Sequence, residues 1–363
     1  MTDTFSINKD ICFEVDYIDE RSYWFVRTNA GEYYDEFKNE GYIAVGFNEI
    51  TDPNLIEKSE EDPVYKKALI EKIKTSAELD DTKSIKPGLI INQLKRFILE
   101  MNVNDIVLIP SLNSQYITFG KIVSDVEIAT LNATDDQDDK CPYIKRRKVR
   151  WLKTISRDKL DPYLYKAIYS HHVITNVSDS KSYINRSLSS VYVESNKAHI
   201  TFKVNTTDEV SLADIRPLLY GFENIAKLAQ LPADIIKDAE EAKIKINVQS
   251  PGPIEYITGL SFIALIGGFV FLYNAYATAK KQGGEMEFSM SPTKGITFSA
   301  KFNAPTNENN DIKPIIDKIL ASEAAKEELK KMSESIDKLN VTLPNETDAE
   351  NTDENKTQNK KEA

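Results

Sequence analysis

The chain has 363 residues, 41% of them hydrophobic and 28% charged, and a formal net charge of -11 at neutral pH. This length predicts two or three domains with buried cores, and the acidic balance excludes a general nucleic-acid coat, which needs Lys and Arg over much of its surface. Two cysteines, Cys12 and Cys141, are too few for a disulfide scaffold and favour a reducing compartment. Residues 1–30 carry no secretory-signal pattern, so we expect a cytoplasmic protein.

An apolar strand, a glycine-containing turn, a short aromatic helix and a second strand follow one another near the start of the chain. The strands are predicted over 23–27 and 41–47, and the helix between them carries Tyr33, Tyr34 and Phe37. This order predicts the opening of a small β-barrel with an aromatic mouth. Barrels of that size commonly hold one small ligand.

Two helices and three further strands complete the segment to about residue 155. The helices are predicted over 62–77 and 86–101, the second with apolar residues at helical spacing. The strands are predicted over 105–110, 115–123 and 143–152, with Val149 and Trp151 on one face of the last. We therefore expect an N-terminal domain of residues 1–155.

The ordered motifs of this segment resemble those of PUA/EVE-like domains, which stand at the front of Mrr-type restriction proteins and other bacterial antiphage proteins. They are Tyr-Trp-Phe-Val-Arg at 23–27, Gly-x-Tyr-Tyr-x-x-Phe at 31–37, Gly-Tyr-Ile-Ala-Val-Gly-Phe at 41–47, Asn-Asp-Ile-Val at 104–107, Tyr-x-x-x-Gly at 116–120 and Arg-Arg-x-Val-x-Trp at 146–151. The resemblance implies a barrel that recognises nucleic acid, often by accepting a flipped base in an aromatic pocket. It therefore implies a reader of modified or unusual bases.

The residues themselves offer groups for such a ligand. A flipped base needs a flat ring to stack on, worth about 1 to 3 kcal/mol, and polar groups that read its edge. The candidate stacking residues are Trp24, Tyr33, Tyr34, Phe47 and Tyr116, and the candidate polar residues are Ser111 and Asn113, with Ser114 beside them. The alternative for Trp24 and Phe47 is that they belong to the barrel core.

The densest basic run of the chain lies at 145–150. On a strand its alternate residues point to one side, so Lys145 and Arg147 are candidates for binding a phosphate backbone. The alternative is a solvated surface, neutralised by the acidic residues at 135–139.

Residues 156–187 predict a helical connector, and residues 188–303 alternate strands and helices in the manner of an α+β domain. We expect no cofactor and no metal: adjacent His171 and His172 on a helix cannot face one ion. A degenerate Mrr-like nuclease is an alternative, in which Asp234 or Asp238 would act with Glu241 and Lys243. No other catalytic constellation is found, so an enzyme is not supported.

Residues 256–279 carry no charge. A helix of that length reaches across the roughly 30 Å of a bilayer core, which makes a membrane-associated effector, at the inner membrane, a second alternative. Strand patterns on both sides favour instead a helix buried on a sheet, and both interpretations stay open at this point.

An amphipathic helix is predicted over 304–343, with its helical pattern at 313–339 as a possible homo-oligomer contact. Residues 344–363 have a composition that cannot bury a core, and they predict a disordered tail. The sequence as a whole predicts an α+β protein. We expect a non-enzymatic defence protein whose N-terminal barrel recognises a nucleotide or nucleic acid, and whose C-terminal domain transmits the signal.

Overall fold

A computed structural model describes residues 15–18, 20–79, 86–130, 140–170, 172–246, 252–281 and 312–344. These residues form two compact units, one of residues 20–188 and one in which residues before 20 join residues from 189 onwards. The part of the predicted α+β segment from 282 to 303 lies outside the described residues, as does the tail predicted over 344–363 apart from Pro344.

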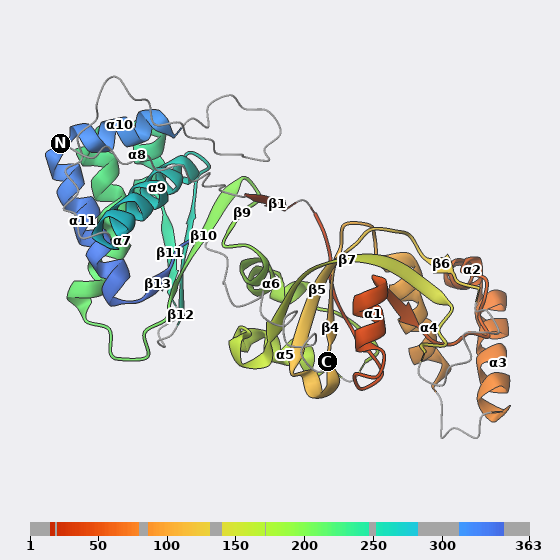
Figure 1. The fold of residues 1–363 in the computed structure, drawn as a ribbon. Helices are drawn as coiled ribbons and strands as arrows, with labels where there is room; N and C mark the ends of the chain where they lie inside the picture. The colour runs from red at the N-terminus through yellow and green to blue at the C-terminus, as the bar shows by residue number, and fades with distance from the viewer. Residues whose placement is uncertain are drawn as a thin grey trace. The chain divides into compact units, whose positions relative to one another are not determined.

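The unit of residues 20–188 is built on a curled half-barrel sheet, with strand order β3-β7-β5-β4-β2-β8 and β6 beside β7 (Figure 1). Only β2 and β4 are parallel among these pairs, with Trp24 opposite Val107. The strands are β2 (Tyr23–Val26), β3 (Tyr42–Val45), β4 (Ile106–Pro110), β5 (Tyr116–Ile122), β6 (Glu127–Ile128), β7 (Lys145–Ser156) and β8 (Ile174–Asn176). The predicted strands of this segment and the α+β class are therefore confirmed.

Both faces of this sheet are covered, which explains the continuous apolar runs of β2 and β4. Trp24 and Val26 point into one core, whereas Tyr23 and Phe25 point into another on the opposite face. The first core also contains residues of α1 (Tyr34–Glu40), which ends where Gly41 takes a φ of 70°.

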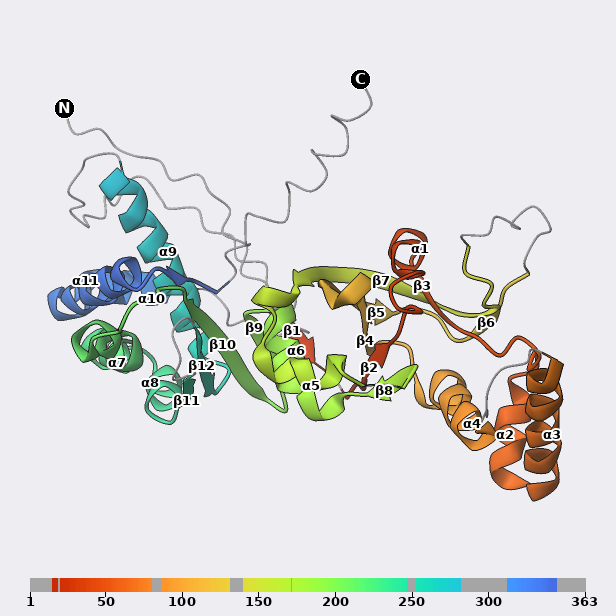
Figure 2. The same cartoon turned by 90° about the horizontal axis from the view of Figure 1, so that it is seen from below.

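Three further helices of this unit lie together beyond one end of the sheet (Figure 2). They are α2 (Asn54–Glu61), α3 (Pro63–Leu79) and α4 (Pro87–Lys95), the last continuing in one wider turn over Arg96–Glu100. The helices predicted over 62–77 and 86–101 are confirmed. Leu94 and Phe97 attach this group to the core shared with α1.

Residues 156–187 are not a connector between domains. They contain α5 (Tyr165–Ile168), β8 and most of α6 (Lys181–Leu188), and β8 pairs with β2 of the half-barrel. Leu164 and Ile184 are buried in the core that also holds Phe25. An apolar pattern at helical spacing predicts a buried helix face but does not identify the surface on which it packs. Here these helices cover the second face of the sheet.

The second unit is a sheet of strand order β1-β9-β10-β12-β11, with β13 also paired to β10. The strands are β1 (Asp16–Ile18), β9 (Val191–Glu194), β10 (Lys197–Val204), β11 (Lys243–Ile246), β12 (Gly252–Thr258) and β13 (Val341–Thr342). The helices are α7 (Leu212–Leu228), α8 (Ala233–Glu240), α9 (Phe262–Lys281), α10 (Lys313–Ala321) and α11 (Glu323–Lys338). Ile200 and Phe202 of β10 lie with residues of all five helices in one core, which confirms the α+β prediction for this segment.

The uncharged segment 256–279 is not one helix. Tyr256 belongs to β12, where it lies opposite Ile200, and α9 begins only at Phe262. Leu265 and Phe269 are fully buried in the core of the unit. None of the helices among the described residues has the length and apolar character that crossing a bilayer requires. Of the two alternatives for 256–279, the spanning helix is therefore corrected, whereas a buried helix is found from Phe262 onwards.

The single helix predicted over 313–339 is two helices. They meet at Ser322, whose Oγ accepts a hydrogen bond from the backbone N–H of Ala325 at the start of α11. Ile319 and Met332 are fully buried within their own unit. The apolar positions that suggested an oligomer contact therefore pack inside the protomer.

Candidate functional site

The expected aromatic mouth is part of the core. Trp24 is 1% exposed, Tyr33 is 7% exposed and Tyr34 is 6% exposed. The ring of Tyr33 meets that of Tyr143 edge-on at 5.3 Å between centroids, and the hydroxyl of Tyr34 lies 2.6 Å from Oγ1 of Thr118. These three rings fill the half-barrel, so they leave no surface on which a base can stack.

Phe47 lies apart from those rings at the end of β3. Its side chain is half-buried against the same core, and its backbone has a φ of 63°. The Phe47 carbonyl accepts a hydrogen bond of 2.8 Å from Nζ of Lys145.

Lys145 and Arg147 do not face solvent, which corrects their assignment to phosphate binding. Lys145 is fully buried, and burial lowers the pKa of its amine to about 8. Arg147 is 2% exposed and donates from Nε to the carbonyl of Phe97 at 2.8 Å and from Nη2 to that of Ile98 at 3.1 Å. Both cations therefore stabilise loop and helix-end carbonyls inside the fold.

Ser111, Asn113 and Tyr116, which the sequence predicted as ligand-binding residues, do lie together. They form the turn between β4 and β5, where the backbone N–H of Tyr116 donates to Oγ of Ser111 at 2.8 Å and its carbonyl accepts from Ser111 at 2.9 Å. Asn113 lies in this turn with a φ of 54°. The turn is supported from behind by Gly31, where an added Cβ would approach Cα of Leu112 to 2.4 Å.

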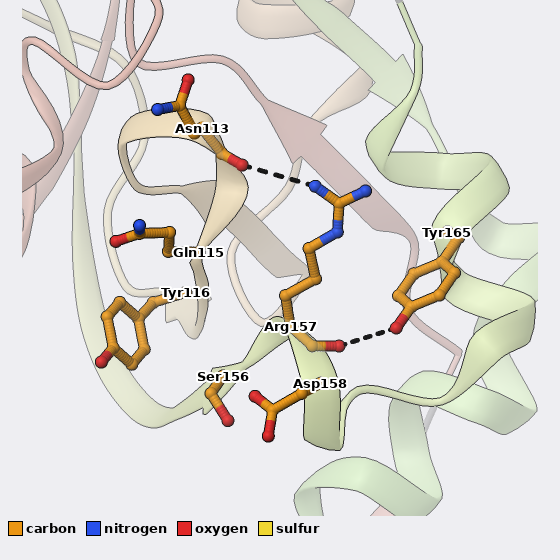
Figure 3. A pocket seen from close by; sticks show the side chains of 7 residues that line it. All are labelled: Asn113, Gln115, Tyr116, Ser156, Arg157, Asp158 and Tyr165. Atoms are coloured by element: carbon orange, nitrogen blue, oxygen red, sulfur yellow. Dashed lines mark hydrogen bonds between the residues drawn. The ribbon is translucent and has the colours of Figure 1, made fainter.

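This turn forms one wall of an open recess of about 590 Å³ (Figure 3). The end of β7 and the start of α5 form the rest, through Arg157 and Tyr165. We call it the Tyr116–Arg157 recess, and the residues that line it are Asn113, Gln115, Tyr116, Ser156, Arg157, Asp158 and Tyr165. Tyr116 is 38% exposed, so a large part of its ring is available to a ligand.

The guanidinium of Arg157 is held across the recess. Its Nη1 lies 3.5 Å from the carbonyl of Asn113, and its Nη2 donates to the hydroxyl of Tyr169 at 2.5 Å. Its Cζ lies 5.7 Å from the ring centre of Tyr165 and 5.6 Å from that of Tyr169, within the range of cation–π attraction. The side chain is thus positioned before any ligand arrives.

A carboxylate completes the polar lining. A hydrogen bond from the side chain of Ser156 lowers the pKa of Asp158, so this exposed group is ionised at neutral pH. Beside a positioned guanidinium and a half-exposed phenol ring, it supplies an acceptor for N–H groups. The recess can therefore receive a flat ring with mixed donors and acceptors along its edge.

Sequence reasoning missed Arg157 and Tyr165. The register of β5 and β7 places Tyr116 opposite Ser156, one position before Arg157, and a strand pairing of this kind is not visible in a single sequence. The signal available was the polar cluster 156–159 directly after a strand.

Two of the alternative nuclease residues, Asp238 and Glu241, have other partners. The carboxylate of Asp238 accepts hydrogen bonds from the backbone N–H and the hydroxyl of Ser261, and Glu241 lies 4.0 Å from Nζ of Lys237. Within the described ranges, no group of three or more His, Cys, Asp or Glu side chains is arranged to hold a metal ion.

The family model described as "Domain of unknown function (DUF8426)" matches residues 24–175, less than half of the chain. The match contains every residue of the Tyr116–Arg157 recess and the half-barrel strands, except the first residue of β2 and the last residue of β8. No curated protein matches the chain.

Proposed function

We propose that this chain is a non-enzymatic recognition protein that binds a nucleobase, as part of a nucleotide or a nucleic acid, in the Tyr116–Arg157 recess. In this proposal the unit of residues 20–188 is the reader. The second unit transmits the bound state.

The observation that carries the proposal is the pairing of a half-exposed ring with a positioned guanidinium. Stacking of a base on an aromatic side chain is worth about 1 to 3 kcal/mol and tolerates any base, because every base has a π-face. Arg157 lines the recess, and a guanidinium presents its five N–H donors in a planar fork that suits base edges and phosphates. Asp158 adds an acceptor, so the recess offers both stacking and edge contacts.

The resemblance of residues 23–151 to PUA/EVE-like domains supports the same ligand class. It also supports a role in defence, since such domains precede the effectors of restriction and antiphage proteins. The recess is not the expected aromatic mouth. Trp24, Tyr33 and Tyr34 were expected to line that mouth, and they are buried.

The test is calorimetric titration of the full chain with mononucleotides, including ones with modified bases. Tyr116→Ala should weaken binding about 5- to 100-fold through the lost stacking, and Tyr116→Phe should retain most of the affinity. Arg157→Gln should weaken binding and change the preference among bases. Tyr163→Ala is the matched control, because that ring is 62% exposed but lies outside the recess.

Unchanged affinity in Tyr116→Ala would reject the recess as the site. Absence of binding to every mononucleotide and oligonucleotide tested would reject the function itself.

A further inference from the structure

Across β5 and β7, two cations face each other that have no acidic partner among the described residues. Lys121 lies directly opposite Arg150 in the antiparallel register. Arg150 is exposed and Lys121 is half-buried. Neither makes a side-chain hydrogen bond or an ion pair within the part of the chain that the structure describes.

This arrangement works against folding. Like charges directly opposite on neighbouring strands are destabilising. Two acids that follow β5 in the chain serve other cations: Glu127 lies 3.5 Å from Nζ of Lys148, and Asp125 lies 4.0 Å from Nη1 of Arg147. An anion bound over Lys121 and Arg150 would neutralise the repulsion. The pair is therefore suited to bind an anion.

The pair and the recess are built on the same two strands. Lys121 lies five positions after Tyr116 on β5, and Arg150 lies seven positions before Arg157 at the end of β7. At about 3.3 Å per residue, the cation pair is roughly 20 Å from the recess along the strands. A mononucleotide bound in the recess cannot reach it, but a chain of several nucleotides can.

Resting on the function proposed above, we infer that the ligand is a single-stranded nucleic acid whose base enters the Tyr116–Arg157 recess. Its backbone follows the exposed and half-buried residues 150–156 of β7 to the Lys121–Arg150 pair. An anionic membrane is a poorer match. Membrane-surface segments concentrate about four to eight cations, whereas the Lys121–Arg150 pair supplies two. Phosphates of a single strand need only such local, spaced contacts.

The test compares the full chain with three variants, using single-stranded DNA and RNA of about 12 nucleotides, which lies within the site sizes of single-strand binding domains. Lys121→Glu converts the repelling pair into an attractive one, so it should preserve or raise resistance to urea while it weakens oligonucleotide binding. The double variant Lys121→Ala/Arg150→Ala should lower the slope of log K against log salt by up to about 1.4, at about 0.7 per lost phosphate contact.

The matched control is Lys66→Ala/Lys67→Ala on exposed positions of α3, which removes the same charge from another surface. It should leave the salt slope unchanged. Mononucleotide affinity should be the same in the wild type and in both variants of the pair, because that ligand does not extend beyond the recess.

The outcomes separate the two proposals. If mononucleotides bind through Tyr116 but oligonucleotides bind no more tightly, or if the salt slope of the double variant equals that of the wild type, this inference fails and the recess stands. Pair-dependent binding to phosphatidylserine vesicles without oligonucleotide binding would also overturn it. If Tyr116→Ala changes neither affinity while the pair variants do, the recess fails and the backbone surface stands.

Discussion

Trp24 donates a hydrogen bond from its indole Nε1 to Oδ2 of Asp105 across 2.8 Å, inside the core of the half-barrel. The same carboxylate accepts from the backbone N–H of Ser22 at 2.8 Å and from that of Asn102 at 2.9 Å. One buried acid thus joins the start of β2 to the loop that precedes β4.

Removal of this acid should be costly. Asp105→Ala leaves the buried indole N–H of Trp24 and the partly buried backbone N–H groups of Ser22 and Asn102 without this acceptor, and we expect the free energy of unfolding to fall by about 3 kcal/mol. Trp24→Phe removes one of the three bonds and should cost about 1 to 2 kcal/mol. Urea denaturation followed by circular dichroism measures both, and an Asp105→Ala variant as stable as the wild type would contradict the assignment.

Lys145 should make stability depend on pH in the alkaline range. Burial lowers the pKa of its amine to about 8 from an ordinary value of 10.5. Between these two values the unfolded chain binds more protons than the folded one, so stability rises with pH across this window. Relative to Lys145→Met, the wild type should gain up to about 3 kcal/mol between pH 8 and pH 10.5. A difference between the two proteins that stays constant across this range would show that the amine is not desolvated.

Gly120 lies where the register of β5 and β7 shifts. An added Cβ would approach Cγ1 of Val149 to 2.4 Å and Cε3 of Trp151 to 2.5 Å. Gly120→Ala should therefore destabilise the unit by about 1 to 3 kcal/mol through overpacking. Gly88→Ala in α4 is the matched control, because nothing lies within 4 Å of its added Cβ. It should stabilise by about 0.5 to 1 kcal/mol, and thermal melting of the two variants in opposite directions is the expected result.

Cys141 should be an inert thiol. Burial raises its pKa to about 11, and the residue is 1% exposed. In a Cys12→Ser background, iodoacetamide at pH 7.5 should leave Cys141 unmodified in the native protein and alkylate it fully in urea. Mass spectrometry reads the result. Native-state alkylation at the rate of a free thiol would refute the burial.

The fold of the first unit was largely accessible from sequence because its strands carry strong local patterns. The run Lys145 to Trp151 shows what was misjudged. Val149 and Trp151 are apolar and lie two and four positions after Arg147, so alternation already assigned Lys145 and Arg147 to the inward face. The basic side chains suggested contact with phosphate, whereas the two-residue alternation of the strand indicated burial. The alternation gave the correct prediction.

The helix predicted over 256–279 had the wrong start, and the reason was a different one. An uninterrupted apolar run does not distinguish a buried strand from a buried helix. Here Tyr256 continues β12 and Phe262 begins α9, with Gly259 between them where an added Cβ would lie 1.9 Å from Oδ1 of Asp238. That contact depends on a residue more than twenty positions away, so local reasoning does not find it.

About half of the candidate site could be predicted from the sequence. Ser111, Asn113 and Tyr116 are adjacent in sequence and form one turn, so their proximity followed from the strand predictions. Arg157 reaches them only because β5 and β7 pair.

Strand β1 pairs with β9, Asp16 opposite Tyr192, although the whole unit of residues 20–188 separates them along the chain. The unit of residues 20–188 is therefore nested within the sequence of the other unit. A chain break before residue 20 separates β1 from a sheet whose other strands all follow residue 188. Removal of residues 20–188 with the two ends joined keeps that sheet on one polypeptide. Such nesting makes the unit of residues 20–188 exchangeable as one insert, without a change to the core of the other unit.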